Sequence, residues 1–222
     1  MKTYKSYYIG VDVGGGSVKF GIFADDNKRK KLIDKFSIKT QFREKNAEKL
    51  LTKDMLDAID SYCKDNKVGM TNISLKGIGY AIPGPVVNNK VLRAVNINWN
   101  KNYNIVKATK ERFGNKTKCV VFNDANAAAL GEFKYDLNSK YKSMCLFTLG
   151  TAVGVGIIID GKLVEGKSGA ARGYPGGLRE HPRDDDGPHR LAAAEGLRSL
   201  LRAGLPALPP VRARLQPALG RA

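Results

Sequence analysis

Short apolar runs separated by turns open the chain. Apolar residues concentrate at 7–13, 18–24 and 31–39, with a glycine cluster between the first two runs. Runs of this length, joined by tight turns, predict three strands of an antiparallel meander. From 46 to 64 the apolar residues recur three or four positions apart, which predicts one amphipathic helix.

Strands and helices alternate in the sequence that follows. The same periodicities predict helices at 103–113 and 124–133, and strands at 76–82, 119–122, 143–149 and 154–160. Gly114 is expected to end the helix before it, and Asp160-Gly161 to form a turn. A strand triplet followed by this alternation is typical of a mixed α/β fold. We expect the first lobe of a two-lobed protein, with the opening strands of a second.

The composition adds a strong positive charge. The 222 residues carry a formal net charge of +17, a property that nucleic-acid-binding proteins share. The lysines are spread along the chain, and the one tight basic run, residues 28–31, lies in a predicted hairpin turn. Because sequence-independent phosphate binding needs charge gathered on one face, we favour a solvated lysine-rich surface over nucleic-acid binding.

Cysteines and hydropathy indicate the cellular compartment. Cys63, Cys119 and Cys145 are scattered without a Cys-x-x-Cys pair, as in proteins of reducing compartments. The apolar runs fall short of the roughly 18 residues that span a bilayer, and the N-terminus lacks the apolar core of a signal peptide. We therefore expect a cytoplasmic protein without a membrane partner.

The composition changes abruptly near residue 172. Residues 1–171 hold 25 Lys and 4 Arg, whereas residues 172–222 hold no Lys, 9 Arg and 7 of the 9 prolines. We interpret this tail, residues 172–222, as coming from DNA of another origin by fusion, recombination or a faulty join. Its leucines keep helical spacing only within 191–205, and prolines interrupt the rest. The tail is expected to be poorly ordered, or to hold one loose helix.

Asp12 and the glycines after it form the first candidate motif. Residues 12–19 lie between two predicted strands. Glycines there let the backbone turn sharply and bring its N–H groups against phosphate oxygens, while Asp12 suits a Mg²⁺ ion held through water. A glycine-rich hairpin without a ligand is the alternative, and the local sequence favours neither. The Gly-Lys-[Ser/Thr] ending of a Walker loop is absent.

The second motif begins where a predicted strand meets an alanine-rich helix, at Asn123 and Asp124. Asp124 could serve as the N-cap of that helix. A carboxylate at a strand end is also suited to act as general base for a hydroxyl. Phosphoryl transfer needs little beyond positioning, Mg²⁺ and one such base. On spacing alone the two interpretations stand equal.

A third motif repeats the order of strand, glycine turn and strand at residues 149–156. Such turns are weak signals when they occur singly. Two of them in one chain could clamp one polyphosphate between two lobes, and the corner at Asn123 and Asp124 strengthens that interpretation.

These three motifs, in this order and spacing, resemble the ROK family of sugar kinases and repressors, within the actin-like ATPase (ribonuclease H-like) superfamily. The resemblance extends through the Pro-Gly-Pro loop at 83–85 and the Asn-x-x-Trp segment that ends at Trp99, and it covers residues 7–171. It implies a two-lobed α/β fold with a truncated second lobe. The implied divisions are an N-terminal lobe at 1–118, the start of a C-terminal lobe at 119–171, and the unmatched tail at 172–222.

The resemblance also implies an activity, the ATP-dependent phosphorylation of a hexose, glucose above all, at its 6-hydroxyl. The implied catalytic base is Asp124, and the implied sugar-binding residues are Gly84, Asn123 and Asp124. The implied phosphate-binding residues are Asp12 (with Mg²⁺ through water), Gly14, Gly15, Lys19, Gly150, Thr151 and Gly154. ATP, Mg²⁺ and the hexose are the implied ligands, and a homodimer is left open for a folded chain, because the sequence does not give the oligomeric state. Two alternatives stay open, a non-catalytic remnant of the family and a sugar-responsive transcriptional regulator.

The chain departs from the family at two places. Gly16 stands where the family usually has Thr, and the hydroxyl lost from the turn is worth about 1 kcal/mol. After residue 171 the family continues with a Gly-Glu-Ile-Gly-His segment, a cysteine-rich zinc loop and the adenosine site, none of which follows here. We assign no zinc site, and no sugar-binding role to His181 or His189. With half of the sugar pocket missing and a sheet face uncovered, we expect poor stability and little or no kinase activity.

Overall fold

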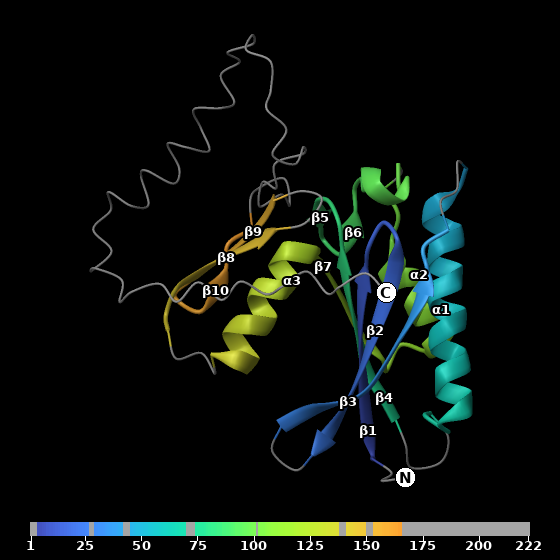
Figure 1. Cartoon of the computed structure of the whole chain (residues 1–222). Helices are drawn as coiled ribbons and strands as arrows, with labels where there is room; N and C mark the ends of the chain where they lie inside the picture. Colours follow the sequence, from blue (N-terminus) through green and yellow to red (C-terminus); the bar gives the residue numbers. More distant parts are fainter. Residues whose placement is uncertain are drawn as a thin grey trace, which may run out of the picture. The chain divides into compact units, whose positions relative to one another are not determined.

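A five-stranded sheet contains the predicted meander. Its strands are β1 (Ser6–Val13), β2 (Ser17–Asp26), β3 (Arg29–Lys39), β4 (Ser74–Ile82) and β7 (Lys118–Asn123). The computed structural model describes residues 4–26, 29–41, 45–69, 74–100, 102–137, 141–149 and 153–165. The strand order is β3-β2-β1-β4-β7 (Figure 1). β1, β2 and β3 pair in antiparallel fashion, which confirms the meander, whereas β4 and β7 run parallel to β1.

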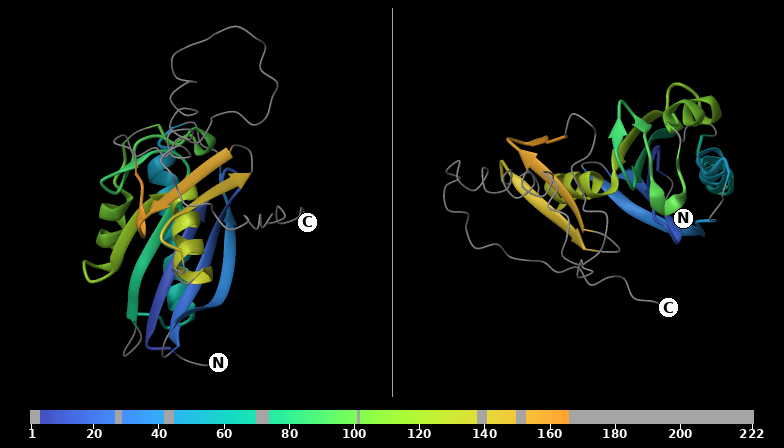
Figure 2. Two further views of the ribbon diagram at one scale, coloured as in Figure 1. Left: turned by 90° about the vertical axis from the view of Figure 1, so that its left-hand side faces the viewer. Right: turned by 90° about the horizontal axis from the view of Figure 1, so that it is seen from above.

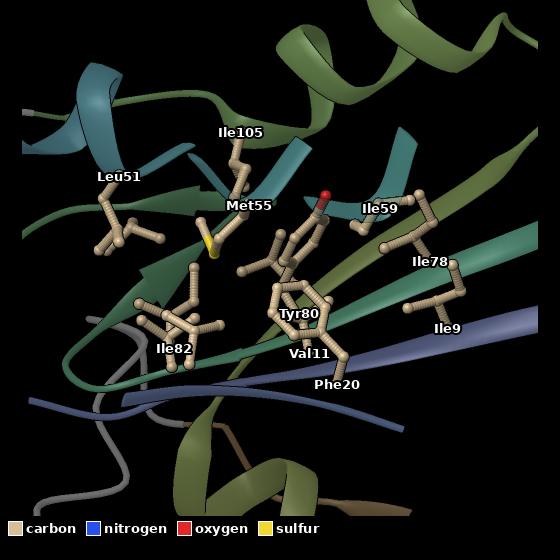
Figure 3. Close-up of a cluster of buried hydrophobic side chains, with 14 of the residues drawn as sticks. Ile9, Val11, Phe20, Leu51, Met55, Ile59, Ile78, Tyr80, Ile82 and Ile105 are labelled. Atoms are coloured by element: carbon tan, nitrogen blue, oxygen red, sulfur yellow. The ribbon is translucent and has the colours of Figure 1, made fainter. Parts of the chain in front are cut away.

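Two helices pack on one face of this sheet. They are α1 (Ala47–Asp65) and α2 (Ile105–Phe113). Figure 2 shows both on the same side of the strands. The apolar stripe of α1 points inward, so that Met55 and Ile59 lie in one buried cluster with Ile78 and Tyr80 of β4 (Figure 3). The Tyr80 hydroxyl in this core is 3.0 Å from Oγ1 of Thr109 in α2, so both hydroxyls are paired.

Side-chain caps explain the bounds of α2. Asn104 Oδ1 accepts from the N–H of Lys107 at 3.0 Å, which makes Asn104 the N-cap. The helix therefore begins two residues later than the sequence predicts, because Tyr103 forms an isolated β-bridge with Val91. Gly114 ends the helix with a φ of 84°, as predicted.

Several short elements were not predicted from the sequence. They are β5 (Val86–Val87), β6 (Lys90–Val91), the 3₁₀ turn η1 (Val95–Ile97), the π-helical turn η2 (Glu132–Asp136) and β10 (Lys162–Leu163). β5 and β6 form a hairpin whose turn residues Asn88 and Asn89 have φ values of 50° and 59°. Asparagine tolerates this left-handed conformation, so the Asn-Asn pair was the available signal.

A second, three-stranded sheet packs against the alanine-rich helix. The elements are α3 (Asp124–Gly131), β8 (Met144–Leu149) and β9 (Val153–Ile159), with the order β10-β9-β8. Ile158 of β9 is buried with Ala129 and Phe133. The turn after β9 has positive φ values at Asp160 (49°) and Gly161 (75°), which confirms the predicted turn.

The other face of β8 and β9 is apolar and exposed. Phe147 and Leu149 of β8 are 56% and 69% exposed. Their cross-strand partners are Val155 and Val153 of β9, so the apolar surface spans both strands. Strands with apolar residues on both faces are typical of a sheet covered on both sides.

Two expectations about the organisation of the chain are not decided by these elements. The lobe division at residue 118 stays a prediction, and β7, which begins at Lys118, completes the first sheet. The tail at 172–222, with its predicted helical stretch at 191–205, lies outside the described residues. Among the helices in the described ranges, none is long and apolar enough to cross a membrane.

Candidate active site

Both predicted carboxylates lie at one edge of the five-stranded sheet. Asp12 in β1 is opposite Ala81 in β4, and Ala81 is opposite Phe122 in β7. Asp124 follows β7 directly. Because β1, β4 and β7 are parallel, their carboxyl ends meet at this edge, where open α/β sheets bind ligands. The sheet thus brings together two residues that are far apart in the sequence.

Asn123, the last residue of β7, is the N-cap of α3. Its side-chain Oδ1 accepts from the N–H groups of Ala125 at 3.1 Å and Asn126 at 3.3 Å. The sequence left open an N-cap role for Asp124. That alternative is wrong, because the preceding residue, Asn123, is the cap. Asp124 is the first residue inside the helix, and its carboxylate is left at the edge of the sheet.

The Asp124 side chain is exposed at this edge of the sheet, although the surrounding atoms take part of its hydration away. Its Oδ1 accepts from the N–H of Ala125 at 2.9 Å. Partial desolvation raises the pKa of Asp124, the hydrogen bond from Ala125 opposes that rise, and the negative charge of Asp12 adds to it. The charge of Asp12 acts on Asp124 only because the two carboxylates are close. A carboxylate with a raised pKa is a stronger base than one in water.

The Pro-Gly-Pro loop is tied to the same edge through Gly84. The Asn123 side chain donates from Nδ2 to the Gly84 carbonyl oxygen at 3.1 Å. Gly84 has a φ of 96°, and a Cβ atom there would collide with the carbonyl oxygen of Arg93. Only glycine fits this position, so the predicted sugar-binding loop passes close to Asn123 and Asp124.

The first glycine turn joins β1 to β2 beside Asp12. The N–H of Gly14 donates to the carbonyl oxygen of Ser17 at 3.0 Å and closes the turn. Lys19, opposite Asp12 in the β1–β2 pair, is exposed, as is Asp12 itself. A Cβ atom on Gly15 would lie 3.4 Å from the carbonyl oxygen of Asn96, so the turn lies against the Asn-x-x-Trp segment.

The hydroxyl of Thr40, at the end of β3, is a contact that the sequence did not reveal. Thr40 Oγ1 donates to the Gly14 carbonyl oxygen at 2.7 Å. The N–H of Thr40 donates to the Gly16 carbonyl oxygen at 3.1 Å. Both partners are distant in the sequence, and no local pattern marks them.

The second glycine turn is only partly described. Gly150 and Thr151, predicted to bind phosphate, lie outside the described residues. Gly154 is in β9, and a Cβ atom there would lie 2.9 Å from the Cβ of Ala125 in α3. This glycine permits close contact between α3 and β9, while its role at a phosphate stays a prediction. Over the described ranges, no cluster of three or more His, Cys, Asp or Glu side chains is placed to hold a metal ion.

Residues 8–174 match the ROK family along most of the chain. This chain belongs to the ROK family. The glucokinase of Halalkalibacterium halodurans is 34% identical over 167 residues, which are 74% of this chain and 48% of that relative. The ROK family glucokinase of Streptomyces griseus, solved with glucose and AMPPNP, superposes with a TM-score of 0.57 at 30% identity, covering 74% of this chain and 48% of that one. The xylose repressor of Bacillus subtilis is 24% identical over 82% of this chain and 44% of its own length.

The ROK comparisons establish the fold as that of the actin-like ATPases, as the motifs predicted. The chain spans about half the length of the curated relatives that it matches. At position 16, where ROK proteins usually carry Thr, a Cβ atom would meet nothing within 4 Å. The glycine at this position is therefore not required by packing, and a threonine has room there.

Proposed function

We propose that this ROK chain phosphorylates a hexose with ATP, with glucose as the preferred sugar and its 6-hydroxyl as the acceptor. Sugar kinases of the family support this proposal, although each matches the chain over only part of its own length. The observation that carries it is the environment of Asp124, a solvent-accessible carboxylate with a raised pKa that follows a parallel strand, beside the loop of Gly84.

Asp124 is proposed as the general base. A sugar hydroxyl within hydrogen-bond distance of the Asp124 carboxylate would give up its proton as the oxygen attacks phosphorus. The raised pKa of Asp124 makes the carboxylate a better proton acceptor in that step. Asn123 and the Gly84 loop are proposed to hold the sugar, with the Asn123 side-chain oxygen already committed to the helix cap.

The first glycine turn is proposed to bind the phosphates of ATP. Among the described residues, none accepts a hydrogen bond from the N–H of Gly15 or Gly16, so both donors are available to an anion. Asp12 is a single exposed carboxylate, which fits a Mg²⁺ ion that takes most of its ligands from water and phosphate. The ion, when bound, would offset negative charge on the phosphates. Lys19 and, beyond the described residues, Gly150 and Thr151 complete the proposed phosphate set.

A sugar-responsive regulator is the second candidate, because a xylose repressor matches 82% of the chain. The two candidates share the sugar site and differ in turnover. A chain that binds a hexose without releasing ADP would favour the regulator or a non-catalytic member of the family.

The deciding experiment is a coupled ADP-release assay with Mg-ATP and, in turn, glucose, mannose, fructose and N-acetylmannosamine. We expect activity with one sugar, glucose first, that Asp124→Asn abolishes and that Asp65→Asn leaves unchanged. Asp65 is an exposed carboxylate in the last turn of α1, outside the proposed site. Turnover that survives Asp124→Asn would show that Asp124 is not the general base. Hexose binding without turnover would contradict the proposed kinase activity.

A further inference from the structure

The end of β3 is fastened to the first glycine turn by two hydrogen bonds from one residue. Thr40 donates through Oγ1 to the Gly14 carbonyl oxygen at 2.7 Å and through its N–H to the Gly16 carbonyl oxygen at 3.1 Å. The second bond continues the β2–β3 ladder, in which Ser17 is opposite Lys39. The hydroxyl bond is additional, since it joins a side chain to a turn that is not part of any strand.

Because the peptide unit is planar, these two hydrogen bonds also fix the directions in which the neighbouring N–H groups point. The C=O of Gly14 and the N–H of Gly15 belong to one planar trans peptide, so they point in opposite directions. The same holds for the C=O of Gly16 and the N–H of Ser17. With both carbonyl groups held by Thr40, the N–H groups of Gly15 and Ser17 are directed away from it. Two donors are thereby presented on the side of the turn opposite β3.

Within the turn, one backbone hydrogen bond, from the N–H of Gly14 to the carbonyl oxygen of Ser17, restricts the backbone. The three consecutive residues at 14–16 are glycines, which have the largest choice of backbone conformations. A side chain on Gly16 would meet nothing within 4 Å, so packing does not restrict the turn there. A pair of N–H groups binds an anion well only if their directions are set before the anion arrives. That one bond leaves the peptide between Gly14 and Gly15 to be held from outside the turn, where Thr40 contacts it.

We propose that Thr40 is a positioning residue for polyphosphate binding, whose hydroxyl holds the Gly14–Gly15 peptide so that the N–H of Gly15 is aimed at a phosphate group, while its backbone N–H holds the Gly16–Ser17 peptide. Thr40 touches no ligand and acts through the turn. This inference rests on the proposed function, because it requires that the turn bind the phosphates of the nucleotide.

The test compares four proteins, each with all 222 residues: the wild type, Thr40→Val, Thr40→Ser and Thr52→Val. Valine has the shape of threonine without the hydroxyl, and serine restores the hydroxyl. Thr52→Val is the matched control, since Thr52 Oγ1 also donates to a backbone carbonyl, that of Glu48 at 2.6 Å, within α1. Calorimetric titrations with inorganic tripolyphosphate and Mg²⁺, and separately with glucose, give the dissociation constants, and urea unfolding gives the stability of each protein.

We expect Thr40→Val to weaken tripolyphosphate binding by about five- to tenfold, the effect of losing one hydrogen bond. Thr40→Ser should bind within about twofold of the wild type, and the glucose constant should not change in either variant. Thr52→Val should lose stability but keep its tripolyphosphate constant. In a chain that turns over, Thr40→Val should raise KM for ATP while KM for the sugar stays unchanged.

Other results would contradict either the role of Thr40 or the assignment of the first glycine turn. Equal tripolyphosphate binding by the wild type and Thr40→Val would show that the hydroxyl does not set the turn, and would leave the proposed function standing. A parallel loss of glucose and tripolyphosphate binding would show a general structural role instead. A wild type that binds glucose but no tripolyphosphate would overturn both this inference and the assignment of the first turn.

Discussion

Asn123 and Gly84 are joined by a hydrogen bond of 3.1 Å, from the side-chain Nδ2 of the first to the carbonyl oxygen of the second. The other end of the same side chain caps α3. One amide therefore fixes the position of the Pro-Gly-Pro loop relative to the helix that begins at Asp124. Its two functions use different atoms, so they can be separated by substitution.

Replacement of Asn123 should separate the cap from the loop contact. Asn123→Ser keeps an oxygen for the cap but loses the donor to Gly84, whereas Asn123→Ala loses both. We expect Asn123→Ala to be less stable than Asn123→Ser by about 1 kcal/mol, the usual value of an N-cap. Urea unfolding measures the difference. Equal stabilities would mean that the cap contributes nothing. A weaker sugar affinity in both variants would show that the contact between Asn123 and Gly84 supports sugar binding.

The raised pKa of Asp124 predicts a pH-dependent stability. A carboxyl group whose pKa is higher in the folded state favours folding fully below its unfolded pKa, about 3.9, and that contribution is lost as the pH rises through the folded pKa. Asp124→Asn carries no such charge. The variant should therefore be more stable than the wild type at neutral pH, and the difference should disappear in acid. Unfolding measured at several pH values checks this, and a variant that is less stable at neutral pH would contradict it.

Asp12→Asn should lower the pKa of Asp124. The negative charge of Asp12 contributes to the raised pKa, but partial desolvation is the larger cause, so the pKa should fall without returning to its ordinary value. The stability change that Asp124→Asn produces, measured against pH with and without Asp12→Asn, gives this shift. A midpoint that stays in place would show that the two carboxylates do not interact.

The contact between α3 and β9 should tolerate no added methyl group. A Cβ atom on Gly156 would lie 2.5 Å from the Cβ of Ala129, and one on Gly154 would lie 2.9 Å from that of Ala125. Gly154→Ala and Gly156→Ala should each lose about 1–3 kcal/mol of stability through overpacking. Gly131→Ala is the matched control, because nothing lies within 4 Å of its added Cβ. The control should be neutral or up to about 1 kcal/mol more stable, and a similar loss in all three would argue against the contact.

The exposed face of β8 and β9 should bind hydrophobic probes. Phe147 is 56% exposed, whereas its neighbour Leu146 packs toward α3. Phe147→Ser should reduce anilinonaphthalene sulfonate fluorescence and aggregation while changing stability by less than about 0.5 kcal/mol. Leu146→Ser should cost about 1–3 kcal/mol. If the dye signal is unchanged in Phe147→Ser, the probe binds elsewhere.

The longer elements followed from the sequence because apolar periodicity is a local property. The strand meander and the helices α1 and α3 were predicted within a few residues, since each buries one face. Asn123 and Asp124 were harder to assign, because both residue types cap helices and only the length of β7 decides between them. The β5–β6 hairpin was missed because two-residue strands have no measurable period. Thr40 was missed because its partners are brought near by the β2–β3 pairing.

The glycine–alanine contact between β9 and α3 also has a mechanical consequence. Gly154 and Gly156 meet Ala125 and Ala129 with no long side chain between the two backbones. Such a contact has no rotamers that could absorb a shift, and a packed interface transmits displacement. A movement of the β8–β9 hairpin must therefore carry α3 with it, and with α3 the carboxylate of Asp124. A displacement of β9 and a displacement of the Asp124 carboxylate are then one motion.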